Sequence, residues 1–297
     1  MKKTLMSLIG SLCILIALAV YQYVVFHDGK LHVVVCDVGQ GDGIYIRSPD
    51  GSDILVDSGP DSAILSCLSR HMPFWDRVID IAIITNADLD HYGGFIEVLK
   101  NYAVKEFVTT DIGKNDKMFD NLIKEVVLRR ISTRVMWSDD ILRDKKIQLV
   151  SLWPTQESLS LVNSQPVKGR AVLGSRTVNS LNPYSLVLAL TYGSFDVLLT
   201  GDIQPPATDE LALRIGGGEI EVLKVPHHGS KNGLTKKLLE VTSPELAIIS
   251  AGRKNKFGHP AQQTLQLLKD FSVPLLRTDQ RGDIEVVSDG KTWIVRP

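Results

Sequence analysis

Short apolar runs that end in clusters of Gly, Asp and His recur along the chain from residue 31 onward. The clearest of these runs are residues 31–37, 79–85, 195–200 and 221–225. Their length and their content of Val, Ile and Leu predict strands, and helical spacing predicts helices at stretches such as 63–71 and 261–271. Because α/β proteins place ligands beyond the carboxyl ends of their strands, the pattern predicts an α/β fold whose site is built from these polar clusters.

The composition of the chain is that of an ordinary folded protein and excludes several other classes. Its 297 residues include 33 Lys and Arg, 34 Asp and Glu, and 44% hydrophobic residues, which gives a formal charge of −1. These values exclude a disordered chain, a collagen-like fibre and a polytopic membrane protein. Three cysteines exclude a disulfide scaffold, and the near-zero charge excludes a uniformly basic binder but not a local basic patch.

The first 27 residues differ from the rest of the chain. Lys2 and Lys3 precede a stretch, residues 4–26, that contains no charged side chain. As a helix rising about 1.5 Å per residue, this stretch would extend roughly 34 Å, enough to cross a hydrocarbon core of roughly 30 Å. Positive charge before the span places the N-terminus in the cytoplasm and the remaining chain outside it. Residues 1–27 are thus predicted to be a single-pass membrane anchor, and residues 28–297 one folded domain.

The sequence leaves the fate of this stretch and the state of two cysteines open. Residues 17–19 fit a small-x-small cleavage site, so a cleaved signal peptide, and hence a secreted protein, is an alternative to the anchor. A buried core helix is the third interpretation, but the apolar run continues past that site to Phe26 and favours the anchor. Cys36 and Cys67 either form a disulfide outside the cell or remain two buried free thiols.

Potential metal ligands gather directly after the predicted strands. The densest group is the hexapeptide at residues 86–91, which contains Asn86, Asp88, Asp90 and His91. Carboxylates and imidazoles bind divalent cations, so this density suits a metal site, with an ordinary polar loop as the alternative. Asp202 follows another strand-like run, and His227 and His228 follow a third. His259 precedes a helix, and its spacing leaves open whether it is a ligand, a substrate contact or a loop residue.

Seven short motifs occur in a fixed order and together resemble a known family. They are C-D-V-G-Q-G-D at 36–42, I-L-V-D-S-G at 54–59, N-A-D-L-D-H-Y-G-G at 86–94, N-P-Y-S-L-V-L at 182–188, L-L-T-G-D at 198–202, V-P-H-H-G-S at 225–230 and F-G-H-P at 257–260. They resemble the metallo-β-lactamase fold and, more closely, the extracellular domain of ComEC-type DNA-uptake proteins and their stand-alone relatives. The resemblance implies a four-layer αββα sandwich for residues 28–297, a hydrolase domain with metal between the sheet edges.

The resemblance also implies a set of metal ligands. Asp90 and His91 match ligands of a second metal site, and Asp202 matches a carboxylate that can bridge two metals. One of His227 and His228 matches a further ligand, and the other is expected to face the substrate. The implied cofactor is one or two divalent ions, Zn²⁺ or Mn²⁺.

Three further residues concern the first metal site. Asp88 matches a ligand that is usually histidine in the wider superfamily. Asn86 stands where the motif normally begins with histidine, and Asn182 lies near where a third histidine is often supplied. Because amide oxygens are neutral and bind zinc more weakly than imidazole does, Asn86 and Asn182 are expected to be weak ligands, and the first site weak, substrate-dependent or empty.

Metal-assisted hydrolysis is the mechanism that this set of residues suggests, with Asp90, His227 and His228 as the catalytic candidates. Residues 224–258 contain seven basic and two acidic side chains, a local excess of positive charge that suits a phosphodiester better than a neutral lactam. The predicted substrate contacts are Ser230, Lys231, Lys254 and His259. The chain is therefore expected to be a membrane-tethered phosphodiesterase or nuclease acting on extracellular DNA. Hydrolysis of another phosphorylated or ester substrate, and a non-catalytic binding protein, remain the alternatives.

Overall fold

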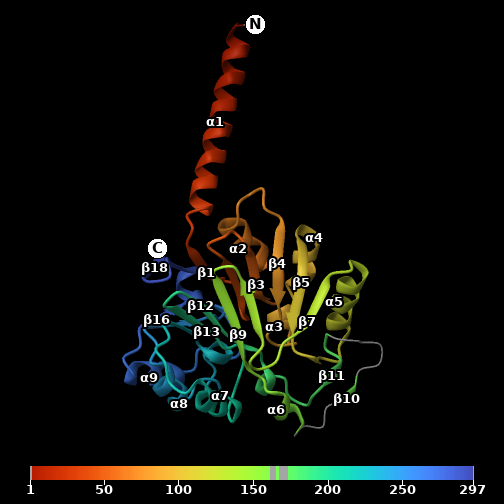
Figure 1. The fold of residues 1–297 in the computed structure, drawn as a ribbon, viewed down its shortest axis with the longest axis vertical. Helices are drawn as coiled ribbons and strands as arrows, with labels where there is room; N and C mark the ends of the chain where they lie inside the picture. Colours follow the sequence, from red (N-terminus) through yellow and green to blue (C-terminus); the bar gives the residue numbers. More distant parts are fainter. Residues whose placement is uncertain (1, 161–164, 167–172, 297) are drawn as a thin grey trace.

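A computed structural model describes residues 2–160, 165–166 and 173–296, and shows two β-sheets packed face to face (Figure 1). Helices cover the outer face of each sheet, and one long helix, α1 (Lys2–Phe26), projects away from these layers. The four-layer αββα sandwich that the family resemblance implies is therefore confirmed.

The first sheet has eight strands and joins the two ends of the domain. In spatial order they are β18 (Trp293–Arg296), β17 (Ile284–Ser288), β1 (Leu31–Val35), β2 (Gly43–Arg47), β3 (Asp53–Ser58), β4 (Val78–Ile83), β5 (Ala103–Thr109) and β7 (Ser132–Val135). Pairing is antiparallel from β18 to β3 and parallel from β3 to β7. Because β3 and β4 are parallel, the loops that follow them lie at the same edge of the sheet.

The second sheet has seven strands. In spatial order they are β16 (Leu275–Arg277), β15 (Leu246–Ile249), β14 (Val222–Lys224), β13 (Phe195–Leu199), β12 (Val187–Tyr192), β9 (Ile147–Trp153) and β8 (Ile141–Asp144). The strands β13 to β16 are parallel, so the loops after β13 and β14 also share one edge. A third, small sheet contains β10 (Gln165–Pro166), β11 (Arg176–Thr177) and β6 (Ile112–Gly113).

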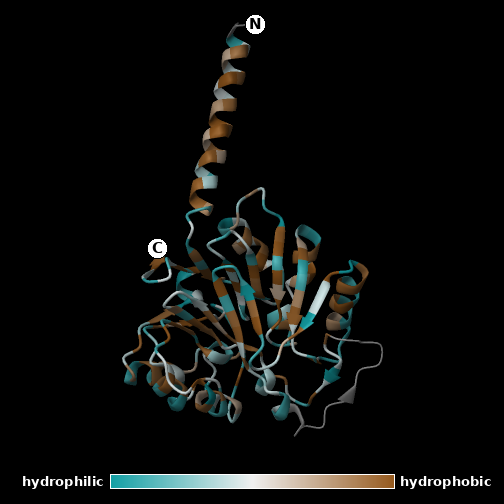
Figure 2. Ribbon diagram, in the orientation of Figure 1, coloured by the Kyte–Doolittle hydropathy of each residue, from teal (hydrophilic) through white to brown (hydrophobic). Residues whose placement is uncertain are grey.

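Successive side chains along a strand point to opposite faces of its sheet. They therefore form an inner core between the sheets and an outer core beneath each helical layer. Val33 and Val35 of β1 point inward and pack with Leu188 and Leu190 of β12, whereas Val34 points outward. The helices on the first sheet are α2 (Ala63–His71), α4 (Phe95–Asn101) and α5 (Lys117–Leu128), and those on the second are α7 (Ala207–Ile215), α8 (Lys236–Thr242) and α9 (Gln262–Asp270). Figure 2 shows the apolar residues gathered on the strands and along α1.

The structure agrees with most of the elements expected from the sequence but adds several short ones. The helix expected at 63–71 is α2, and the strand expected at 43–47 is β2. The sequence does not predict the strands β6, β7, β8 and β18, because each has four residues or fewer and lies at the edge of its sheet. The surface loop expected at 163–180 lies partly outside the described residues, and its described part contains β10 and β11. Five short helical segments complete the described part of the chain: α3 (Leu89–Tyr92), α6 (Gln156–Ser160), α10 (Thr278–Arg281) and the 3₁₀ turns η1 (Asn182–Tyr184) and η2 (Pro226–Gly229).

The N-terminal helix α1 is separate from both cores. Its apolar window is not buried against any described part of the chain, which rules out the interpretation as a core helix. By length and composition it fits a membrane-spanning helix or a signal sequence. Arg47, at the end of β2, donates from Nε to the carbonyl oxygen of Phe26 at 3.1 Å. The last turn of α1 is thus hydrogen-bonded to the folded domain.

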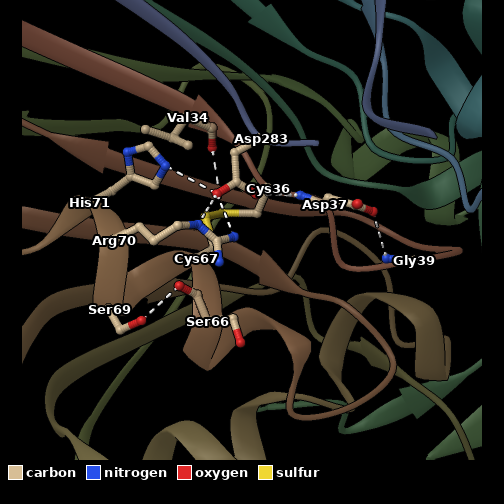
Figure 3. The surroundings of a disulfide bond; sticks show 10 residues. All are labelled: Val34, Cys36, Asp37, Gly39, Ser66, Cys67, Ser69, Arg70, His71 and Asp283. Carbon is tan, nitrogen blue, oxygen red and sulfur yellow. Dashed lines mark hydrogen bonds and ion pairs between the residues drawn. A yellow bond between two sulfur atoms is a disulfide. The ribbon is translucent and has the colours of Figure 1, made fainter. Parts of the chain in front are cut away.

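A disulfide joins Cys36, directly after β1, to Cys67 in α2 (Figure 3). Both cysteines are fully buried, so of the two states left open by the sequence, the structure contains the disulfide. The bond ties the helix layer to the first sheet across 31 residues of sequence. Cys13, in α1, is a free cysteine.

Asp283, in the loop before β17, accepts hydrogen bonds from several elements beside this disulfide (Figure 3). Its carboxylate accepts from the Asp37 amide at 2.9 Å and lies 3.1 Å from His71 Nε2. Arg70 donates to the same carboxylate at 2.6 and 2.9 Å. Burial would by itself raise the pKa of Asp283, but these hydrogen bonds lower the pKa to about 2.

Loss of the disulfide is predicted to lower the free energy of unfolding. Closure of a loop of this length by a covalent bond contributes about 3–4 kcal/mol by restricting the unfolded chain. We expect the free energy of unfolding of the double variant Cys36→Ala, Cys67→Ala, measured with urea, to be lower by this amount. Dithiothreitol should destabilise the wild-type protein and leave the double variant unchanged. Equal sensitivity of the two proteins to the reductant would contradict the bond.

Asp283 is predicted to make stability depend on pH at the acid end. Because the folded chain lowers the pKa of this carboxyl from 3.8 to about 2, the unfolded chain binds more protons in that interval. The stabilisation is thus complete above about pH 4 and is lost as the pH falls towards 2. Urea unfolding of the wild type and Asp283→Asn at several pH values should show a difference in free energy that shrinks in this window. A difference independent of pH would contradict the assignment.

Candidate metal centre

Polar loops from both sheets meet at one end of the sandwich, away from α1 (Figure 1). α3 follows β4 and contains Asp90 and His91. Asp202 follows β13, and the 3₁₀ turn η2 (Pro226–Gly229) follows β14 and contains His228. The parallel pairing of β3 with β4 and of β13 with β14 places these loops at the facing edges of the two sheets.

Four side chains from these loops direct their ligand atoms towards one point. The ligand atoms of Asp90, His91, Asp202 and His228 all lie within 4.8 Å of one another. His91 Nε2 is 3.2 Å from Asp202 Oδ2, and His228 Nε2 is 3.3 Å from Asp202 Oδ1. His228 Nε2 also lies 3.4 Å from Asp90 Oδ2. Three of the four side chains are buried, and Asp90, with 32% of its side chain exposed, forms the open side of the cluster.

The donor set of this cluster fits a divalent cation. Within the described residues, His91 Nε2, His228 Nε2 and Asp202 Oδ1 are buried and form no hydrogen bond. A buried polar atom without a partner costs free energy, so such atoms commonly mark a bound ion or water. Two imidazole nitrogens with two carboxylates are a ligand set that Zn²⁺ and Mn²⁺ both accept.

His91 is held by Asp57, at the end of β3. Asp57 Oδ2 lies 2.8 Å from His91 Nδ1, which leaves Nε2 directed at the cluster. Asp57 in turn accepts from the backbone N–H of Thr85 at 2.8 Å and from its hydroxyl at 2.5 Å. A carboxylate on the far nitrogen of a ligating histidine fixes its tautomer and orientation.

His228 is held by a second carboxylate, that of Asp42. His228 Nδ1 lies 3.2 Å from Asp42 Oδ1 and 3.1 Å from the carbonyl oxygen of Ser250. The other oxygen of Asp42 pairs with the fully buried ammonium of Lys224, at the end of β14. His228 itself has a φ of 53°, a left-handed conformation that turns its ring inward from η2.

Gly41 allows the loop that contains Asp42 to approach the cluster. A Cβ atom at this position would lie 2.2 Å from the carbonyl oxygen of Asp90, so only glycine fits. The same carbonyl accepts a hydrogen bond from the backbone N–H of Asp42 at 3.1 Å. The Q-G-D part of the first motif thus serves close backbone contact with the ligand loop.

The electrostatics of the cluster follow from its buried carboxylates. Burial would lower the pKa of His91, but Asp202 and Asp57 raise it well above its usual value. Burial would also lower the pKa of His228, but Asp202 and Asp42 raise it well above its usual value. Burial would raise the pKa of Asp202, but the two imidazoles lower it well below its usual value. The cluster therefore retains cations, whether protons on the imidazoles or a metal ion that competes with them.

The residues expected at a first metal site make other contacts. Asn86 accepts from the backbone N–H of Asp88 at 3.1 Å and donates to Asn182 Oδ1 at 3.0 Å and to Ser185 Oγ at 3.1 Å. The remaining amide group of Asn182 faces His227 Nε2 at 3.4 Å. Both atoms of the Asn86 amide are thus engaged, and the two asparagines form a relay that ends at His227.

Asp88 lies outside the four-residue cluster. Its carboxylate pairs with the ammonium of Lys114 at 2.5 Å, and the two residues line a cavity of 460 Å³ together with Asn115, Asn179 and Asn182. A lysine thus supplies positive charge to Asp88, where a first metal would otherwise supply it.

The expected substrate residues surround the cluster at different depths. His227 lies 3.7 Å from Asp202 through Nε2, and its ring centroid is 5.7 Å from that of His259. Burial lowers the pKa of His227, which favours the neutral form of this imidazole. Ser230 is buried, and its hydroxyl accepts from the Asn232 amide at 3.3 Å. Lys231 and Lys254 are exposed in the loops that carry these motifs.

Sequence reasoning missed four residues that support the site. Asp42 and Asp57 lie in motifs that were recognised but given no role, and their positions directly after strands were the available signal. Lys114 gave no sequence signal. Lys224 contributes to the positive charge counted over residues 224–258, but it is buried and paired with Asp42.

Comparison with known proteins identifies a matching family and several similar proteins. The family model of the metallo-beta-lactamase superfamily matches residues 36–253. ComE operon protein 3 of Bacillus subtilis is 27% identical over 96% of this chain and 36% of that protein. Competence protein ComA of Neisseria gonorrhoeae is 32% identical over 87% of this chain and 32% of that protein. The chain spans about a third of the length of these relatives, and the resemblance to competence proteins expected from the motifs is confirmed.

Two solved structures share the fold at low sequence identity. The metallo-beta-lactamase fold protein YhfI of Bacillus subtilis superposes with a TM-score of 0.55 at 13% identity, covering 87% of this chain and 100% of YhfI. Zn²⁺-bound PqqB of Methylobacterium extorquens superposes with a TM-score of 0.51 at 10% identity, covering 83% of this chain and 97% of PqqB. The match over residues 36–253, the αββα layers and the Asp–His cluster at the sheet edges agree with one another: the chain belongs to the metallo-β-lactamase superfamily.

Proposed function

We propose that this chain is a membrane-anchored, metal-dependent phosphodiesterase that cleaves DNA outside the cytoplasm. The observation that carries the proposal is the convergence of Asp90, His91, Asp202 and His228 on one point, where buried ligand atoms of the last three form no hydrogen bond within the described chain. The fold of the superfamily binds divalent metals, and these four residues would hold one such ion, Zn²⁺ or Mn²⁺. The amide relay and the Asp88–Lys114 pair argue against a second ion.

The chemistry divides between the ion and the residues around it. A divalent ion supplies a lowered pKa for water and positive charge beside a phosphoryl oxygen. Asp90 forms the open side of the cluster, where it can accept the proton of an attacking water. His227, oriented through Nε2 by the Asn182 amide, can donate a hydrogen bond to the phosphoryl or leaving oxygen. His259, 5.7 Å from His227 between ring centroids, extends the same wall.

Nucleic acid is the substrate class that the surroundings support best. Lys231 and Lys254 are exposed beside the motifs and can contact phosphates along a strand. The 460 Å³ cavity beside the cluster is lined by amides, hydroxyls and the ammonium of Lys114, groups that hydrogen-bond to bases and sugars. A relative whose name refers to competence points to the same substrate class.

Three observations support placement at the outer face of a membrane. α1 is long and apolar enough to cross a bilayer, and Lys2 and Lys3 precede it. The hydrogen bond from Arg47 to Phe26 joins α1 to the domain. The disulfide between Cys36 and Cys67 is of a kind that persists in oxidising compartments.

Loss of a cluster ligand is predicted to remove the metal. The full-length chain is purified with excess Mn²⁺ or Zn²⁺ and then desalted. Elemental mass spectrometry should then find one ion per chain. His228→Ala should bind the ion at least about 100-fold more weakly, because one of four ligands is lost. Asn182→Ala is the matched control, since it removes a residue of the amide relay and should keep one ion. Metal retained by His228→Ala, or two ions in the wild type, would contradict the one-ion site.

DNA cleavage is the test of the proposed function. Full-length protein in lipid vesicles should cleave single- or double-stranded DNA with Mn²⁺, Mg²⁺ or Zn²⁺ and stop with EDTA. Asp202→Ala should abolish cleavage, whereas Lys231→Ala with Lys254→Ala should raise KM and leave kcat largely unchanged. Turnover of a small phosphodiester without DNA cleavage would indicate another substrate. If metal-loaded protein binds DNA without hydrolysing it, the chain is a non-catalytic binding protein. The amide relay at the expected first metal site also favours that alternative.

A further inference from the structure

Two aromatic side chains are exposed side by side in the connection from α2 to β4. The side chains of Phe74 and Trp75 follow Pro73, with 61% and 43% of their residue surface exposed. Their rings meet edge to face with centroids 4.9 Å apart, and no other part of the described chain is recorded in ring contact with them. Adjacent exposed aromatic residues on a folded domain commonly mark a surface that is covered in the cell.

The aromatic pair lies close to the point where α1 joins the domain. Arg47 donates from Nε to the Phe26 carbonyl at 3.1 Å, and its Nη1 lies 3.7 Å from the carboxylate of Asp76, the residue after Trp75. Asp53 holds the same guanidinium at 2.7 and 2.8 Å, so the buried Arg47 cannot move freely. One side chain thus fixes the end of α1 relative to the aromatic connection.

The same end of the domain faces α1 in Figure 1. The connection between α2 and β4 is the part of the sandwich that rises furthest towards α1, and α3, with its cluster ligands, lies at the other end of β4. β2 spans this distance, because Gly43 follows Asp42 of the metal centre and Arg47 contacts α1. Five residues at about 3.3 Å each separate the two ends by roughly 15 Å.

We propose that Phe74 and Trp75 insert into the interfacial layer of the bilayer that α1 crosses, as a second contact of the domain with the membrane. Trp and Phe settle at the level of lipid headgroups, because their rings are apolar and the indole N–H stays hydrated. One helix alone would let the domain rotate and tilt. Two contacts on one face hold it upright, with the metal centre directed away from the lipid. This inference rests on the membrane anchor of the proposed function, not on the proposed nuclease activity.

Fluorescence quenching by brominated lipid tests the contact on the full-length chain. The chain has four tryptophans, so the emission of Trp75 is obtained as the difference between wild type and Trp75→Phe in the same vesicles. Trp137 is the matched control: it lines a pocket with Gln156 of α6 and Arg176 of β11, elements far from α1 in Figure 1. The Trp137→Phe difference isolates its emission in the same way.

We expect the Trp75 emission to lose most of its intensity in vesicles of phosphatidylcholine brominated near the headgroup end of the acyl chains, and the Trp137 emission to be unchanged. Flotation of the protein with the vesicles establishes the anchor separately. Flotation with equal Trp75 emission in plain and brominated vesicles would overturn the contact, leave the anchor standing and point to a protein partner for the aromatic pair. A full-length chain that does not float would overturn both the anchor and the contact.

Discussion

The site depends on the packing of the two sheets, because the carboxylate of Asp202 lies between two imidazoles from different sheets. His91 follows β4 in the first sheet, whereas Asp202 and His228 follow strands of the second. Any change in the distance between the sheets would separate Asp202 from His91. The inner core of alternating Val, Ile and Leu residues fixes the distance between the sheets. The geometry of the site therefore depends on the apolar pattern of the strands.

Each histidine of the candidate metal centre depends on a buried carboxylate behind it. Asp57 orients His91, and Asp42, paired with Lys224, orients His228. Placing so much charge in a core destabilises a fold unless every group has a partner, and here each carboxylate has one. The residues expected at the first metal site have partners within the protein: Asn86 bonds to Asn182, and Asp88 pairs with Lys114.

The domain has a polarity that follows the strands. The loops at one end of the sandwich carry the candidate metal centre, and at the other end Arg47 joins α1 to the aromatic connection. Because strands are stiff, the distance between these two ends is set by strand length and not by a flexible linker. The candidate site therefore lies at the end of the sandwich opposite the junction with α1.

The sequence by itself determined the α/β class and most strands, because apolar periodicity and polar clusters after strands are local signals. The layers and the candidate ligands Asp90, His91, Asp202 and His228 followed from the resemblance of its seven ordered motifs to a known family. Only the tertiary structure decided that Cys36 meets Cys67, that Lys224 is buried against Asp42, and that Asn86 bonds to Asn182. These contacts join residues 31, 182 and 96 positions apart, and pairings at such separations leave no periodicity in the chain. They depend on how the two sheets bring distant strand ends together.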